Sequence, residues 1–229
     1  MACISEHHLN EYTMLGVWKI EEDLKTLMSM VELGPDDLKK FRQFKSNSRK
    51  LEFLSVRALL SELLGPEARI VYNKNNKPFL KDGSHFISIS HSNKLTALML
   101  SSRERIGLDL EYMSANITGI ARKFINENEK ITRSWRLKKY HLYLHWCAKE
   151  ALFKICDKEG INMQNNITIY PFDVNESGDI RGEVKTELIN EVFDLQYTCY
   201  ENYAIVWTKK EYDDKEAEKA KMRRPVNGS

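Results

Sequence analysis

Apolar residues in the first half of the chain recur at helical spacing and then, after residue 69, at the spacing of strands. Before that change, the pattern predicts a strand over 14–19, helices over 21–31 and from Pro35, and an amphipathic helix over 48–64. After it, the pattern predicts strands over 69–72, 86–90 and 95–100. The residues Gly65 and Pro66 end the long helix in this prediction.

The second half repeats this layout loosely. It predicts a strand over 106–111, a long helix over 135–157, and strands over 167–172, 179–184, 193–201 and 203–209. Each half therefore contains a strand, a long helix and antiparallel strands, which predicts an α+β fold of two similar halves. We expect subdomains at 1–104 and 105–211, followed by a charged tail at 212–229.

Composition narrows the class of protein. The 229 residues carry 35 Lys and Arg against 33 Asp and Glu, a balance that argues against a protein that coats nucleic acid. No run approaches the roughly 18 apolar residues of a membrane span, and the N-terminus has no signal-peptide pattern. Four scattered cysteines without a CxxC pair are typical of a reduced, cytoplasmic protein.

The strand over 106–111 is the most informative segment. Because side chains alternate across a strand, Leu108 and Leu110 face a core while Asp109 and Glu111 lie together on the other face. Two neighbouring carboxylates repel unless a proton or a cation lies between them, and Mg²⁺ suits such oxygen ligands. Gly107 leaves room for a ligand to approach. The alternative is an ordinary solvated strand face.

The long helix of the second half offers a second group of polar residues. Trp146, Lys149, Glu150 and Lys154 lie at offsets 0, 3, 4 and 8, which predicts one stripe with a carboxylate between two ammonium groups. Glu150 could bind a metal or act as a base, and the lysines could neutralise phosphate. The alternative is a surface ion pair between Glu150 and Lys154.

Two further groups could bind phosphates in the first half. Ser90 and His91 end a predicted strand, where free backbone N–H groups, a hydroxyl and an imidazole suit an anion. The basic residues Arg49 and Arg57 share a helix face, and Lys77-Pro78 follows a turn; ordinary surface charge is the alternative. A Ser-His-Asp hydrolase is disfavoured because the sequence has no GxSxG motif.

One group of residues suggests a different chemistry. His141 and His145 are four apart on the predicted helix, with Cys147 nearby. Zinc is disfavoured there because the HExxH glutamate is missing.

Five segments in this order resemble the 4′-phosphopantetheinyl transferases, specifically their surfactin-type or enterobactin-synthase-associated branch. They are R-K-L-E-F-L-S-V-R at 49–57, N-K-P at 76–78, S-I-S-H-S at 88–92, G-L-D-L-E at 107–111 and W-C-A-K-E-A-L-F-K at 146–154. The chain departs from the family pattern at Asn76 and Asn93, where many members have glycine, and at Ser88 and Leu95.

The resemblance implies two α+β subdomains related by a pseudo-two-fold, the first binding coenzyme and the second binding metal, with the site in the cleft between them. It implies a Mg²⁺-dependent enzyme that moves the phosphopantetheine arm of coenzyme A onto a serine of an acyl or peptidyl carrier protein, releasing 3′,5′-ADP. The resembled branch also suggests a monomer, while the balanced charge and the lack of a long apolar run argue against a nucleic-acid or membrane partner.

The resemblance also implies roles for individual residues. Asp109, Glu111 and Glu150 would hold Mg²⁺, and the catalytic residues would be Asp109, Glu150 as proton acceptor and Lys154 at the leaving phosphate. Coenzyme A would be held by Arg49, Arg57, Lys77, Pro78, Ser90, His91, Lys149 and Lys154.

The carrier proteins of this family are generally acidic, so a basic rim would steer them, with Phe124 as a docking residue or, alternatively, a core aromatic. Two other functions stay open: a Mg²⁺-dependent hydrolase or phosphotransferase acting on a nucleotide pyrophosphate, and a carrier-binding module without catalysis.

Overall fold

The structure is a computed structural model that describes residues 3–114, 116–156 and 160–211. The described chain divides into two compact units. Unit 1 comprises the described residues of Met1–Glu104 together with Glu211, and unit 2 comprises those of Arg105–Lys210. The predicted charged tail at 212–229 lies outside the described residues, as does Asp157, the last residue of the predicted long helix.

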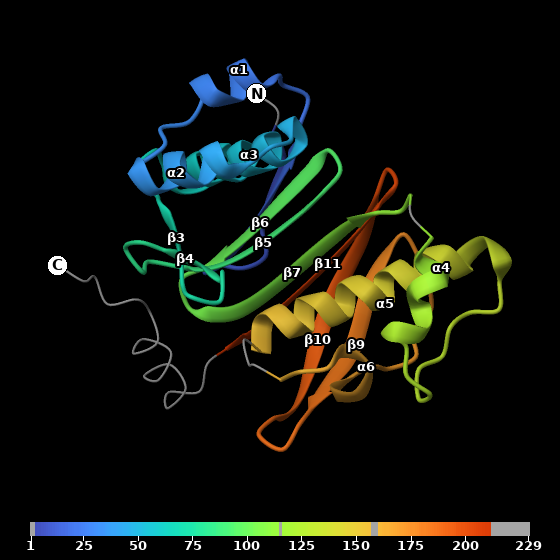
Figure 1. Cartoon of the computed structure of the whole chain (residues 1–229). Helices are drawn as coiled ribbons and strands as arrows, with labels where there is room; N and C mark the ends of the chain where they lie inside the picture. The colour runs from blue at the N-terminus through green and yellow to red at the C-terminus, as the bar shows by residue number, and fades with distance from the viewer. Residues whose placement is uncertain (1–2, 115, 157–159, 212–229) are drawn as a thin grey trace. The chain divides into compact units, whose positions relative to one another are not determined.

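Unit 1 contains a four-stranded sheet, three helices and a two-stranded hairpin (Figure 1). Its elements are β1 (Cys3–His8), β2 (Thr13–Lys19), α1 (Leu24–Ser29), α2 (Pro35–Gln43), α3 (Asn47–Leu64), β3 (Ile70–Tyr72), β4 (Pro78–Leu80), β5 (Phe86–Ser92) and β6 (Leu95–Ser101). The sheet has the order β1-β2-β6-β5 with antiparallel neighbours throughout, and β3 pairs with β4.

Helix α3 forms the core of unit 1 because its apolar residues pack on the sheet. The hydroxyl of Ser46 caps its start by accepting from the N–H of Arg49 at 3.2 Å. Gly65 follows the helix with φ 91°, a left-handed conformation that favours glycine, and it ends the helix. Leu54, Leu59 and Trp18 are fully buried in the resulting core.

Unit 2 packs one long helix and shorter turns against a five-stranded sheet of the order β7-β11-β10-β9-β8 (Figure 1). Its elements are β7 (Glu104–Tyr112), α4 (Ile117–Ile120), the 3₁₀ turn η1 (Ala121–Lys123), α5 (Trp135–Cys156), α6 (Met163–Asn166), β8 (Ile167–Ile169), β9 (Ser177–Lys185), β10 (Asn190–Tyr200) and β11 (Tyr203–Glu211). Leu144, Leu152 and Ile167 are fully buried where α5 meets the sheet.

Gly107 allows α5 to lie directly on β7. A Cβ atom at residue 107 would clash with the carbonyl oxygen of Ala151 and lie 3.1 Å from the Cβ of Ile155. The sequence analysis predicted that Gly107 leaves space for a ligand. That prediction is wrong, because the backbone of α5 fills the space.

We therefore expect Gly107→Ala to lower the free energy of unfolding by about 3 kcal/mol or more, since the backbone of α5 would have to move. Urea denaturation measures this difference. Gly34→Ala is the control, because a Cβ there meets nothing within 4 Å, and it should cost less than about 1 kcal/mol. A Gly107→Ala protein as stable as the control would contradict this close packing.

The predicted α+β class is confirmed, and the two long helices and most strands lie where the sequence pattern predicts them. The pattern missed β1, an edge strand of polar residues, and the short elements β4, α4, η1 and α6. None of the helices in the described ranges is long and apolar enough to cross a membrane. Cys147, Cys156 and Cys199 are free thiols. The pseudo-two-fold and the functional labels of the two halves stay predictions.

Candidate active site

Two carboxylates of β7 and one of α5 form an acidic cluster in unit 2. Leu108 and Leu110 point into the core at 0% and 1% exposure, so Asp109 and Glu111 face the other side of the strand. Asp109 is itself 5% exposed. Helix α5 brings Glu150 to this face, because Gly107 lets Ala151, the next residue along, pack on β7.

The electrostatics of the cluster show that its three carboxylates interact. Burial raises the pKa of Glu150 to about 7; the charge of Asp109 and, to a smaller extent, that of Glu111 raise it too, while Lys154 opposes them. The Lys154 ammonium lies 2.7 Å from Oδ1 of Asp109 and donates to the carbonyl oxygen of Leu108 at 2.8 Å. The cluster thus contains three carboxylates and one cation.

This donor set has the chemistry that a hard divalent cation requires, namely several carboxylate oxygens whose mutual repulsion a cation would relieve. Burial is the main cause of the raised pKa of Glu150, and the charges of Asp109 and Glu111 add to it. Within the described ranges, however, no three His, Cys, Asp or Glu side chains are arranged as a metal-ligand group. In the arrangement described, Lys154 rather than a third carboxylate lies against Asp109.

Trp146 supports the acidic cluster from one turn earlier on α5. Its indole Nε1 donates to Oε1 of Glu111 at 3.4 Å, and its ring meets that of Phe124 edge-on, with centroids 5.2 Å apart. Phe124 is 1% exposed, so its predicted role as a docking residue is wrong and the core alternative is correct.

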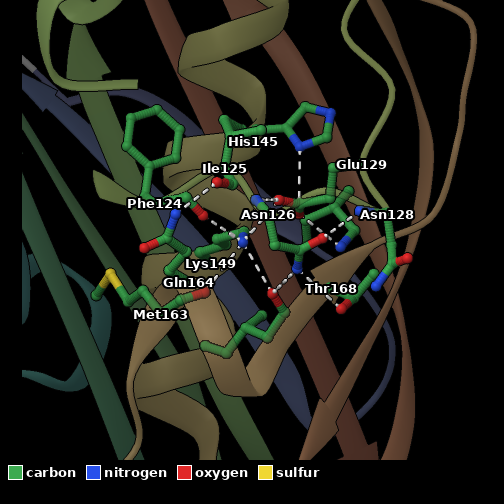
Figure 2. Close-up of polar contacts among 12 residues, drawn as sticks. Phe124, Ile125, Asn126, Asn128, Glu129, His145, Lys149, Met163, Gln164 and Thr168 are labelled. Carbon is green, nitrogen blue, oxygen red and sulfur yellow. Dashed lines mark hydrogen bonds and ion pairs between the residues drawn. The ribbon is translucent and has the colours of Figure 1, made fainter. Parts of the chain in front are cut away.

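The structure corrects the role predicted for Lys149. Figure 2 shows its ammonium surrounded by protein oxygens: the carbonyls of Phe124, Met163 and Ile167 accept from Nζ at 2.5, 3.0 and 2.8 Å. A carboxylate oxygen of Glu129 lies 2.9 Å away. Because Lys149 is fully buried and its donors are used within the fold, it is not placed to bind coenzyme A. Lys149 and Lys154 point to different sides of α5, not along one stripe.

Glu129 extends this buried network to His145 of α5 (Figure 2). Burial tends to raise its pKa, but hydrogen bonds from His145 and Lys149 outweigh this and lower it. His145 and His141 lie with their Nε2 atoms 3.2 Å apart, and burial and the neighbouring His145 lower the pKa of His141 to about 4. The histidine pair is therefore a polar contact within the core of unit 2.

In unit 1, the structure brings Arg49 and His91 together through a glutamate. Nη1 of Arg49 donates to Oε2 of Glu52 at 2.6 Å, and Nδ1 of His91 lies 3.5 Å from the same oxygen. Glu52 is 8% exposed, whereas the Arg49 side chain is 54% exposed and that of His91 30%. Two groups that can carry positive charge thus reach the surface beside one buried carboxylate.

Arg57 lies apart from Arg49 and His91, and the structure also corrects its predicted role in binding coenzyme A. Its Nη2 donates to Oδ1 of Asp37 at 2.7 Å, and its guanidinium stacks 3.4 Å from the ring centre of Phe53. Both partners of the ion pair are about 8–9% exposed. Arg57 therefore joins α2 to α3 inside unit 1 and is not available to a coenzyme.

The remaining predicted coenzyme residues lie on two hairpins of unit 1. Lys77 and Pro78 belong to the β3–β4 hairpin, and Ser90, at 7% exposure, lies near the end of β5. Asn76 and Asn93 in the turns of these hairpins have φ of 59° and 54°. Asparagine adopts this left-handed conformation more readily than most residues, which explains why it can replace a family glycine there.

The comparison with known proteins finds a family match for the second half of the chain. Residues 105–211 match the family model of the 4′-phosphopantetheinyl transferase superfamily. This part of the chain is similar to members of that superfamily. The matched region contains the whole acidic cluster and the Lys149 network.

Individual 4′-phosphopantetheinyl transferases are similar over part of this chain. HetI of Nostoc is 25% identical over 159 residues, which are 60% of this chain and 66% of HetI. AcpT of Salmonella typhi is 35% identical over 120 residues, 46% of this chain and 58% of AcpT. The transferase gsp of Aneurinibacillus migulanus is 31% identical over 111 residues, 46% of each protein. The chain thus spans between about half and two thirds of the length of these transferases.

The sequence analysis did not identify two of the buried carboxylates, Glu52 and Glu129, as functional candidates. Glu52 and Glu129 are charged residues in segments that are otherwise largely buried, and each is bound by two cationic or imidazole groups. The signal for Glu52 is its place among apolar residues of α3, where an unpaired carboxylate would be costly. No local pattern marks Glu129, because its partners are 16 and 20 residues away on α5.

Proposed function

We propose that the protein is a Mg²⁺-dependent 4′-phosphopantetheinyl transferase that moves the phosphopantetheine arm of coenzyme A onto a serine of an acyl or peptidyl carrier protein and releases 3′,5′-ADP. The observation that carries this proposal is the acidic cluster of Asp109, Glu111 and Glu150 within the region that matches the superfamily. Neither a solvated strand face nor a surface ion pair explains why three carboxylates are gathered there.

Asp109, Glu111 and Glu150 would hold Mg²⁺, which, when bound, offsets the charge of the pyrophosphate oxygens of coenzyme A. Lys154, next to Asp109, would neutralise the phosphate that leaves. The acceptor serine oxygen forms a bond to the β-phosphorus, and the bond from that phosphorus to the bridging oxygen of the pyrophosphate breaks. Glu150 would accept the serine proton, a role for which a pKa of about 7 is well suited.

The coenzyme would be held in unit 1 by the cationic pair of Arg49 and His91, with Ser90, Lys77 and Pro78 as further contacts. The support for this is the placement of Arg49 and His91 on one carboxylate, Glu52, with both side chains partly exposed. A phosphate group would bind best when His91 is protonated. Arg57 and Lys149 are left out of this set because they are buried in ion pairs. The cytoplasmic location and the monomeric state stay predictions.

Transfer should depend on pH through Glu150. Because burial and Asp109 raise the pKa of this carboxyl to about 7, it is largely protonated below pH 6 and largely ionised above pH 8. Only the ionised form can bind Mg²⁺ or accept a proton. We therefore expect kcat/KM at limiting Mg²⁺ to rise as the pH increases from 6 to 8 and the midpoint to move to lower pH at saturating Mg²⁺. A midpoint that is insensitive to Mg²⁺ would contradict the assignment of Glu150 as a ligand.

The decisive experiment incubates the protein with coenzyme A, Mg²⁺ and an apo carrier protein and weighs the carrier by mass spectrometry. A gain equal to one phosphopantetheine group is the expected result. Consumption of coenzyme A without that gain would support the hydrolase, the main alternative. Modification of the carrier that persists unchanged in Asp109→Ala would overturn the assignment of the metal site.

A further inference from the structure

The first two turns of α5 carry an exposed group of aromatic and basic side chains, here called the basic-aromatic surface. It comprises Trp135, Arg136, Lys138 and Lys139, all exposed to solvent. Trp135 is 80% exposed, which is unusual for the residue type with the largest apolar side chain. The next full turn of α5, from His141 to His145, is entirely buried. The exposed surface is therefore confined to the start of the helix.

The positive charges of this surface do not stabilise helix α5. Residues 133–139 contain four cations and no acid, and the first turn of α5 lacks an acidic residue. Cations at this end of a helix oppose its dipole and destabilise it. Since the whole chain carries a formal charge of only +2, the concentration of positive charge here is local.

The arrangement has the composition of a binding surface for an anionic protein. Trp and Arg are the residues most often found at the centre of protein interfaces, where an exposed ring can bury a large area. The guanidinium of Arg136 lies 5.2 Å from the Trp135 ring, so an aromatic and a cationic contact are offered side by side. Charges around such a centre steer an oppositely charged partner.

A membrane or a nucleic acid fits this surface less well. The two exposed apolar residues, Trp135 and Leu137, are two positions apart and therefore point to nearly opposite sides of the helix, whereas a membrane-binding helix needs one continuous apolar face. A nucleic acid requires a basic face over a much larger area than two helical turns, on a chain whose charge is almost balanced.

We infer that the basic-aromatic surface docks an acidic face of the protein whose serine is modified. This inference rests on the proposed function, and it replaces Phe124, which is buried, by Trp135 as the aromatic docking residue. The contact lies outside the acidic cluster, so it acts on the affinity for the acceptor protein and not on the chemical step.

The test measures steady-state transfer to an apo carrier protein that the wild type modifies, with Trp135→Ala and the pair Lys138→Glu/Lys139→Glu. Each variant should raise the KM for the carrier roughly 10-fold or more, with kcat and the KM for coenzyme A unchanged. The control is the double variant Leu188→Ala/Lys185→Glu, which changes one exposed apolar and one exposed basic residue outside α5. It should leave all kinetic constants unchanged. Equal thermal unfolding of the variants and the wild type shows that the fold is kept.

A charge exchange makes the assay specific for contact with the carrier. Changing acidic surface residues of the carrier to lysine should restore part of the affinity of Lys138→Glu/Lys139→Glu while weakening that of the wild type. An unchanged KM for the carrier in both variants overturns the docking surface while leaving the proposed function intact. If the variants lose the binding of the wild type to anionic lipid vesicles while their KM for the carrier is unchanged, the docking proposal is overturned in favour of a membrane-binding surface. A wild type that modifies no carrier overturns both proposals.

Discussion

Glu150→Gln is expected to lower kcat/KM for phosphopantetheine transfer at least about 100-fold, because the amide removes one anionic ligand and the proposed proton acceptor together. Glutamine has nearly the shape of glutamate, so the packing of α5 on β7 should be kept. The measurement is the rate of carrier modification at saturating Mg²⁺ and coenzyme A. The control is Glu187→Gln, an exposed glutamate of unit 2, which should keep full activity.

The same variant should be more stable than the wild type, and this distinguishes a loss of function from a loss of fold. Burial and Asp109 raise the folded-state pKa of Glu150 above the value of an exposed carboxyl. Such a group destabilises the folded state at a pH above its unfolded pKa, and the penalty is complete above its folded pKa of about 7. At pH 8 with a chelator, Glu150→Gln should therefore raise the free energy of unfolding by roughly 1–2 kcal/mol. Retained transfer, or a marked loss of stability, would contradict this account of Glu150.

Lys149→Met is expected to lower the free energy of unfolding by about 3–5 kcal/mol, because it leaves the buried carboxylate of Glu129 without its main cationic partner. The three carbonyl oxygens that accept from Nζ of Lys149 also lose their donor. Urea denaturation at pH 7 measures the change. Lys185→Met, at an exposed position of β9, is the control and should alter stability by no more than about 0.5 kcal/mol.

A second substitution separates the ion pair from packing effects. In Lys149→Met/Glu129→Gln the buried charge is removed from both sides, so the double variant should be clearly more stable than Lys149→Met alone. Additive losses from the two substitutions would show that the residues contribute independently. A cost of less than about 1 kcal/mol for Lys149→Met would contradict the buried network shown in Figure 2.

The sequence predicted the elements whose apolar residues have a clear period. The long helices α3 and α5 and the buried strand β6 follow directly from such patterns. The edge strand β1 did not, because its residues are mostly polar and it is held by pairing with β2. Pairing between distant segments leaves little trace in local sequence.

For the candidate site, the sequence predicted which residue types come together but not the direction of each side chain. Lys149 and Lys154 belong to the same motif, yet one is buried against Glu129 and the other lies at Asp109. That difference depends on the loop carrying Glu129, which folds back onto α5 from a segment with no recognisable pattern. Arg57 was misjudged for a related reason, because Asp37, its partner, lies 20 residues earlier on α2.

Asp109, Glu111 and Glu150 are proposed to bind one divalent ion together. Calorimetric titration of the protein with Mg²⁺ at pH 8 tests this proposal most directly, with Asp109→Asn and Glu187→Gln titrated in parallel. The account predicts one saturable site per chain in the wild type and in Glu187→Gln, with an affinity that falls when the titration is repeated at pH 6, and loss of that site in Asp109→Asn. Equal Mg²⁺ binding by Asp109→Asn and the wild type would contradict it.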